Sequence, residues 1–193
     1  MTYKQQQAGF SLIEVLVAIT VLLIATVGPM TIAAQALKSA QYSREQNTAF
    51  FLAQEGIEAV VLFRNEAALV HLDDPSNSSR AWQSDPQITL CASGEGCGFH
   101  FTLSGVTNNS PIDCSGSNSP CRLYFDENDP RARYSHNRNG GEPTPFTRQV
   151  FVQPLGSGER MRVTSIVNWQ PAGNLPPQTV RLQTFIHDIY NTN

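Results

Sequence analysis

One long apolar run dominates the first fifth of the chain, beginning after Gly9 and continuing to Leu37. A single charged residue, Glu14, interrupts this run. Residues 15–37 are about 23 uncharged and mostly apolar positions, which as a helix would extend for about 35 Å. A helix of that length crosses the hydrocarbon core of a bilayer. The pattern therefore predicts a membrane-spanning helix over residues 10–37.

Helical periodicity continues beyond Leu37 to about Ala68, so residues 38–72 are predicted to extend the same helix as an amphipathic segment. One apolar face is predicted to consist of Phe50, Ala53, Ile57, Val60 and Val61. A second apolar set is predicted to point roughly the other way and contains Leu52, Ala59 and Phe63. Because a helix that lies on one sheet needs a single apolar stripe, two stripes predict neighbouring helices in an assembly. The alternative is a helix buried deep in its own domain.

The pair Gly28-Pro29 lies inside the apolar run. A proline within a helix removes one backbone hydrogen bond and clashes with the preceding turn, at a cost of about 3 kcal/mol or more. A kink or a locally melted turn is therefore predicted at this helix break. Membrane helices tolerate such a break better than soluble ones do.

The pattern changes at residues 73–79, where aspartate, proline and serine cluster and end the helix. Short alternating runs follow, at Ile88 and Leu90, at Phe99, Phe101 and Leu103, and at Leu123 and Phe125. Three longer alternating runs are predicted to be strands, and they contain Phe146, Arg148, Val150 and Val152, then Met161, Val163, Val167 and Trp169, then Val180, Leu182 and Ile186. Glycine-rich and proline-rich segments separate these three runs, which favours antiparallel hairpins.

These elements predict an α+β fold with a long N-terminal helix, membrane-spanning in its first half, packed on a mostly antiparallel β-sheet. The predicted divisions are a leader over residues 1–9, the spanning helix over 10–37, its amphipathic continuation over 38–72, and a head over 73–193 that is rich in strands.

Four cysteines, Cys91, Cys97, Cys114 and Cys121, all lie in the predicted head. An even number of cysteines in an exported domain favours disulfides. Each local pair encloses turn residues, so we expect Cys91–Cys97 and Cys114–Cys121, with the nested pairing as the alternative. Zinc ligands are usually closer together in sequence, which makes a zinc site the weaker interpretation. We expect neither a metal nor a cofactor.

The net charge of −3 and the pI near 5.8 do not favour a nucleic-acid partner. A locally basic zone that could touch DNA contains Arg131, Arg133, Arg138 and Arg148. The acidic string from Asp126 to Asp129 could hold calcium, but it lacks the full loop motif, and a solvated turn is the preferred interpretation. The histidines are scattered and no catalytic motif is present, so we do not expect an enzyme.

Glu14 needs an explanation, because a charge at the centre of a spanning helix costs roughly 2.5 to 3.5 kcal/mol on insertion scales. A secretory signal peptide would have Lys4 as its basic region and a cleavage site at Ala34-Gln35-Ala36. Its apolar region is usually shorter and uncharged, however. A plain single-pass anchor, with the first nine residues in the cytoplasm, also leaves the string from Gly9 to Glu14 unexplained.

The string from Gly9 to Glu14 is the beginning of the longer segment GFSLIEVLVAI. This segment resembles the processing motif of type IV prepilins and type II secretion pseudopilins. The resemblance implies that prepilin peptidase cuts after Gly9 and methylates the new amino terminus at Phe10. It also implies that Glu14 acts in assembly, and that Gly28-Pro29 lies in a stretch that loosens as subunits leave the bilayer. Once Phe10 carries the terminal ammonium, a carboxylate four residues away can pair with that cation, which offsets the desolvation cost.

A second string, LAQEGIE at Leu52–Glu58, resembles the corresponding segment of PilV-like minor pilins, also called type IV pilus modification proteins. The stretch from Leu123 to Trp169 is similar to their C-terminal half. These resemblances imply a minor pilin whose partners are other pilin subunits, prepilin peptidase and the inner-membrane assembly machinery. A type II secretion pseudopilin, a static single-pass anchor for an extracellular binding domain and an exported hydrolase are the alternatives.

The implied location follows from the same resemblance. Before assembly the chain would be a single-pass protein of the inner membrane with its head outside the cytoplasm, and after assembly it would be part of an extracellular pilus or a periplasmic pseudopilus.

Overall fold

The computed structural model describes residues 9–74, 83, 86–92, 94–99, 101–102, 105–106, 111–115, 121–128, 134–138, 141–156, 160–171 and 175–187. The chain divides into two compact units, Met1–Arg44 and Glu45–Asn193. The first unit contains the beginning of the long helix, and the second contains the rest of that helix together with the sheet.

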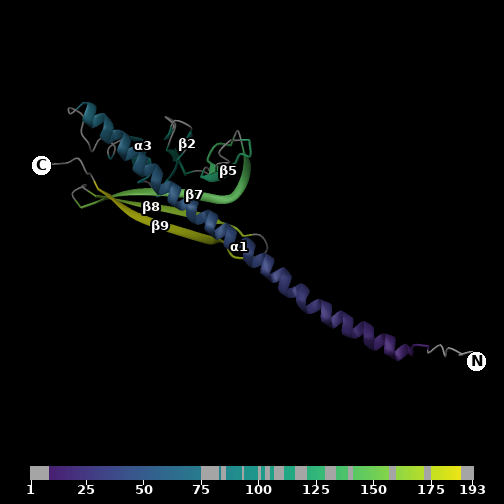
Figure 1. Cartoon of the computed structure of the whole chain (residues 1–193). Helices are drawn as coiled ribbons and strands as arrows, with labels where there is room; N and C mark the ends of the chain where they lie inside the picture. Colours follow the sequence, from purple (N-terminus) through teal and green to yellow (C-terminus); the bar gives the residue numbers. More distant parts are fainter. Residues whose placement is uncertain are drawn as a thin grey trace, which may run out of the picture. The chain divides into compact units, whose positions relative to one another are not determined.

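Helix α1 spans Leu12–Asp73 (Figure 1). It stays helical through Gly28-Pro29, so the described helix contains no melted turn at the predicted break. Pro29 lacks the N–H that would otherwise donate to the carbonyl oxygen of Ala25, so the helix continues here with one backbone hydrogen bond fewer. One missing bond within a long helix does not interrupt it, and any loosening on leaving the membrane stays a prediction.

Three long antiparallel strands form the main part of the sheet: β7 (Glu142–Leu155), β8 (Arg160–Trp169) and β9 (Gln178–His187). They pair without interruption, from Phe146 opposite Trp169 to Leu155 opposite Arg160, and from Arg160 opposite His187 to Trp169 opposite Gln178. The three long strands and the antiparallel order predicted from alternation are therefore confirmed.

Short elements complete the described part of the head. They are α3 (Pro86–Leu90), β1 (Cys97–Gly98), β2 (Phe101–Thr102), β3 (Gly105–Val106), β4 (Ile112–Asp113), β5 (Arg122–Phe125) and β6 (Tyr134–Ser135). Strands β1 and β5 both pair with β7 along the edge away from β8, while β2 and β3 form a separate ribbon. The short alternating run at Ile88 and Leu90 is helix α3 and not a strand, because two alternating residues are too few to distinguish the two periods.

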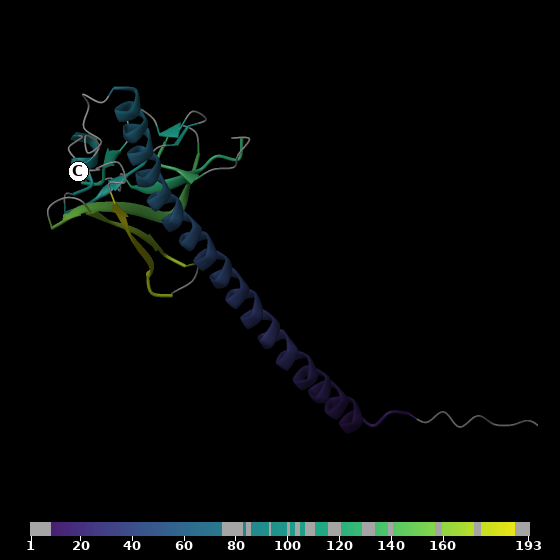
Figure 2. The same cartoon turned by 60° about the vertical axis from the view of Figure 1, so that its left-hand side comes forward.

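The second part of α1 covers one face of the β7–β8–β9 sheet (Figures 1 and 2). Among the helix positions whose burial is described, the buried ones are Ala49, Leu52, Ala53, Gly56, Ala59, Val60 and Ala68. The predicted grouping of apolar residues into two opposed stripes is therefore wrong. Ala53 of the first predicted set and Leu52 of the second lie beside each other on the helix face that contains Gly56. Both sets therefore contribute to a single surface that faces the sheet. Phe50 is instead 46% exposed.

Two apolar clusters form where this helix meets the sheet. One contains Ala59 and Val60 of α1 with Val150, Val152 and Val163 of the sheet, together with α3 and the first cysteine pair. The other contains Ala49, Leu52 and Ala53 of α1 with Leu123, Phe146, Val167 and Trp169. The inward row of each strand thus packs against a helix face of small residues, which lets the backbones approach closely.

Candidate processing and assembly site

The residues of the predicted processing string lie at the start of α1. Gly9, Phe10 and Ser11 precede the helix, and Phe10 is 82% exposed. Glu14 lies in the first helical turn and is also exposed. Residues 1–8 of the predicted leader, including Lys4, lie outside the described residues.

Ser11 occupies the N-cap position of this helix, which we did not predict from the sequence. Its carbonyl oxygen accepts the backbone N–H groups of Glu14 and Val15, at 3.0 and 3.2 Å. A signal was present, because Ser11-Leu12-Ile13-Glu14 has the spacing of a capping box before an apolar run. Glu14 is thus also an acidic residue at a helix N-terminus, where the helix dipole favours a negative charge.

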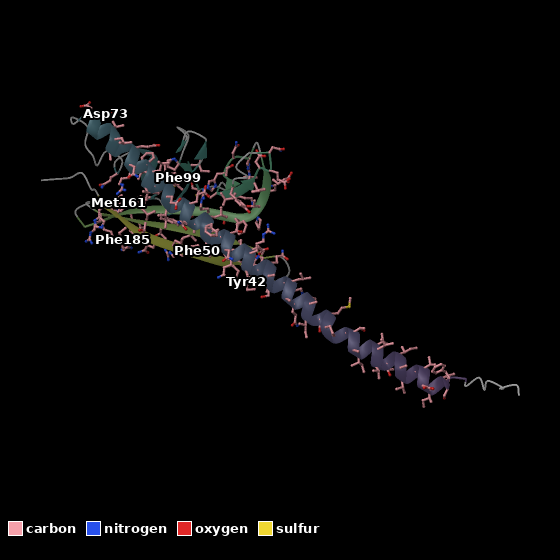
Figure 3. The ribbon with its side chains drawn as sticks, in the orientation of Figure 1. Tyr42, Phe50, Asp73, Phe99, Met161 and Phe185 are labelled. Carbon is pink, nitrogen blue, oxygen red and sulfur yellow. A yellow bond between two sulfur atoms is a disulfide. The ribbon has the colours of Figure 1, made fainter. Side chains whose placement is uncertain are left out.

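The first part of α1 exposes its apolar side chains around the whole helix (Figure 3). The most apolar window has a mean hydropathy of 2.4 and is 0% buried, and the helix is long enough to cross a membrane. Its large apolar side chains, such as Leu12 at 77% and Ile24 at 76% exposure, are not buried against any of the residues 9–44 that the structure describes in this unit. Burial in lipid or against other helices would remove this surface from water.

Residues 4–28 match the family model of the prokaryotic N-terminal methylation motif. The chain therefore carries a type IV prepilin-like N-terminus. The matched segment includes Gly9, Phe10 and Glu14, and it ends at Gly28. No curated protein and no solved structure gives a significant match to the chain. The motif implies a precursor of a type IV pilin-like protein or of a pseudopilin.

Within the second compact unit, the string Leu52–Glu58 of α1 contacts the sheet through an ion pair with a buried arginine. Arg148 on the inward face of β7 is 0% exposed, and its Nη1 donates to Oε2 of Glu55 at 2.9 Å and to the carbonyl oxygen of Leu52 at 3.2 Å. Burial lowers the pKa of Arg148, while the negative charge and hydrogen bond of Glu55 raise it. The guanidinium stays charged, so it needs this partner.

Gly56, next to Glu55, lets the helix lie close to the sheet. A Cβ atom at this position would lie 2.6 Å from Oγ of Ser165 and 3.0 Å from Cγ2 of Val150. Any larger residue would push α1 away from the strands. The close approach also shortens the distance that Glu55 must reach to Arg148.

The prediction that Arg148 belongs to a basic surface zone is wrong. Arg148 lies in the core beneath α1 and not on a basic surface, because it occupies the inward row between Phe146 and Val150. Arg138 is exposed and its Nε donates to the hydroxyl oxygen of Tyr124 at 3.0 Å. Arg131 and Arg133 lie outside the described residues. The alternation that we recognised in the sequence already placed Arg148 on an apolar face, where an arginine requires an acidic partner.

The structure has the local cysteine pairs, Cys91–Cys97 and Cys114–Cys121. Cys91 directly follows α3; its N–H donates to the carbonyl oxygen of Ile88 at 2.9 Å and its own carbonyl accepts the N–H of Val152 at 3.0 Å. Cys97 lies in β1 opposite Val150. The first disulfide thus joins two short segments that both contact β7.

Removing this disulfide is expected to loosen both segments. Replacing Cys91 and Cys97 together by alanine should lower the free energy of unfolding by about 2 to 2.5 kcal/mol, since a closed loop this short constrains the unfolded chain by that amount. Hydrogen exchange should accelerate over residues 86–98. The same double replacement at Cys114 and Cys121 is the control and should leave exchange in α3 unchanged. Unaltered exchange over residues 86–98 in the first variant would contradict this role.

The acidic string near Asp126 forms a turn, in which the carboxylate of Asp126 accepts the N–H of Asn128 at 2.9 Å. Asp129 lies outside the described residues. Among the residues that the structure describes, no group of three or more His, Cys, Asp or Glu side chains could hold a metal ion.

Proposed function

We propose that this chain is a structural subunit of a type IV pilus-like filament, specifically a minor pilin. Prepilin peptidase removes the leader over residues 1–9 and methylates Phe10. The helix over 10–37 then passes from the inner membrane into the filament, residues 38–72 continue it, and the head over 73–193 is displayed outside the cytoplasm. The other partners are pilin subunits and the inner-membrane assembly machinery.

The observation that carries this proposal is the methylation motif at the start of a helix whose most apolar stretch contains no buried residue. A static anchor would account for the apolar surface but not for the motif. Glu14 connects the methylation motif with the apolar helix. A carboxylate in an apolar setting is stabilised by the ammonium that cleavage before Phe10 creates.

Apolar exposure in the second part of α1 supports the filament as well. Phe51, Leu69 and Val70 are 67%, 62% and 55% exposed on a helix whose other side already covers the sheet. A pilin bundle would supply neighbouring helices for these side chains. The resemblance of Leu52–Glu58 to PilV-like minor pilins favours a minor subunit over a pseudopilin, and within this string Glu55 and Gly56 hold the helix on the sheet.

Mass spectrometry of the amino terminus tests the proposal. In cells that contain prepilin peptidase, we expect the mature chain to begin at an N-methylated Phe10, and in cells without the peptidase we expect Met1 to be retained. Replacing Gly9 by leucine should prevent cleavage while leaving the chain in the membrane. A mature chain that begins after Ala36, or an uncleaved chain in the presence of the peptidase, would contradict it.

A further inference from the structure

Strand β9 forms one border of the seven-stranded sheet (Figure 2), and within the described residues it pairs only with β8. The pairing runs from Gln178 to His187 with no bulge, and the strand contains neither proline nor lysine. Natural edge strands usually carry such features, which prevent another strand from adding to the sheet. Because antiparallel pairing uses alternate residues, every second residue of β9 directs its backbone N–H and C=O groups away from β8. The carbonyl oxygen of His187 already accepts a hydrogen bond from Nη1 of Arg64 at 3.1 Å, so the edge available to a further strand lies before His187.

The sheet face that lies opposite α1 is basic next to this edge. Arg160 and His187 are directly opposite one another, Arg162 lies opposite Phe185, and Arg181 lies opposite Ile166. Arg160, Arg181 and His187 are exposed, and Phe185, labelled in Figure 3, is 51% exposed. No outward position between Thr147 and Leu155, Arg160 and Asn168, or Thr179 and His187 is acidic. This concentration of positive charge is unusual in a chain whose net charge is −3.

The opposite face of β9 contains two apolar residues that are only partly covered. Val180 and Leu182 are half-buried at the margin of the core that contains Phe146 and Trp169. A further strand beside β9 would cover their remaining surface. The edge thus offers backbone hydrogen bonds, a basic row on one face and an apolar row on the other.

We infer that β9 is a docking edge for an extended segment of another polypeptide, in which acidic and apolar residues alternate. Such a segment adds to the sheet as a further strand through backbone hydrogen bonds, as in other cases of strand addition. One of its carboxylates faces Arg181, since opposite charges on neighbouring strands stabilise the pair, and another lies within reach of a hydrogen bond from the His187 ring. Its apolar residues lie beside Val180 and Leu182. The inference is independent of N-terminal processing, so its failure would leave the proposed function untouched.

A ten-residue peptide that alternates glutamate with valine or threonine is the probe, added to the full-length chain in detergent. Fluorescence anisotropy measures its affinity, and hydrogen exchange measures protection of the β9 amides. We expect binding with slower exchange at alternate residues of β9. The Arg181→Glu variant should weaken binding about fivefold, because an attractive cross-strand pair becomes repulsive. Arg122→Glu, an equal change at an exposed position of β5, is the control and should not alter the affinity.

Two further probes distinguish an acidic peptide from other ligands that the β9 edge could bind. A peptide with lysine in place of glutamate should bind more weakly, and equal binding of both peptides would overturn the inference. A single-stranded thymidine oligonucleotide that binds in an Arg181-dependent way, while the acidic peptide gives no protection of β9, would make the surface a nucleic-acid site instead. Concentration-dependent protection of β9 without any peptide would show pairing with a second copy and would also overturn it.

Discussion

Replacing Glu55 by alanine is expected to destabilise the head by about 3 to 5 kcal/mol, because it leaves the guanidinium of Arg148 buried without its carboxylate. The two side chains meet at 2.9 Å, and that of Arg148 is 0% exposed. Unfolding in urea, followed by tryptophan fluorescence on the full-length chain in detergent, measures the change. Trp169 lies in the neighbouring cluster and reports on the packing of α1 against the sheet.

Glu58→Ala is the matched control, since this residue lies one turn further along α1, is exposed, and accepts a hydrogen bond from Gln54. We expect it to cost less than about 0.5 kcal/mol, as surface substitutions usually do. Arg148→Met should cost less than Glu55→Ala, because the Glu55 side chain is 31% exposed and water can solvate it. The double variant Glu55→Leu/Arg148→Met should recover most of the stability. Equal effects of Glu55→Ala and Glu58→Ala would show that the ion pair does not hold the helix on the sheet.

Glu14→Val is expected to leave membrane insertion intact and to abolish incorporation into filaments. Valine makes the helix more apolar, so the chain should still enter the bilayer, but the ammonium created at Phe10 would lose its partner. Immunoblots of membranes and of sheared filaments measure the two outcomes. Thr20→Val is the control, because it removes a polar group from the same helix, a hydroxyl that donates to the carbonyl of Val17, without removing a charge.

Glu14→Gln separates assembly from helix capping. Glutamine retains the hydrogen-bonding pattern of a capping box after Ser11 but carries no charge. If the carboxylate pairs with the ammonium of Phe10, this variant should fail to incorporate as the valine variant does. Normal incorporation of Glu14→Gln would instead show that the charge is not needed and would assign the side chain of Glu14 to the capping box with Ser11.

Helix α1 shows which structural features hydrophobic periodicity alone can predict. Its spanning length, its continuation beyond Leu37 and its end near Asp73 follow from a local pattern that each turn repeats. The side that faces the sheet does not follow from it, because apolar residues occur almost all around the helix. Packing against the sheet determines which side of the helix is buried. It is the side that contains Gly56, where small residues let the helix backbone lie close to Ser165.

The strands also show which features a local sequence pattern can predict and which it cannot. Alternation over ten residues predicted β8 and β9, whereas two alternating residues at Ile88 and Leu90 could not distinguish a strand from the short helix α3. Ser11 and the pairing of Glu55 with Arg148 were missed, although a capping-box spacing and an arginine on an apolar face were both visible in the sequence.

By itself, the sequence determined the features that short stretches of chain encode. These are the methylation motif with Gly9, Phe10 and Glu14, the apolar helix, the three long strands and the cysteine pairs that enclose short turns. The tertiary structure alone decided which residues distant in sequence meet. Glu55 and Arg148 are 93 residues apart, and only the close contact of α1 with β7 brings them together. Such pairs depend on burial, since a charge that water could solvate would need no partner.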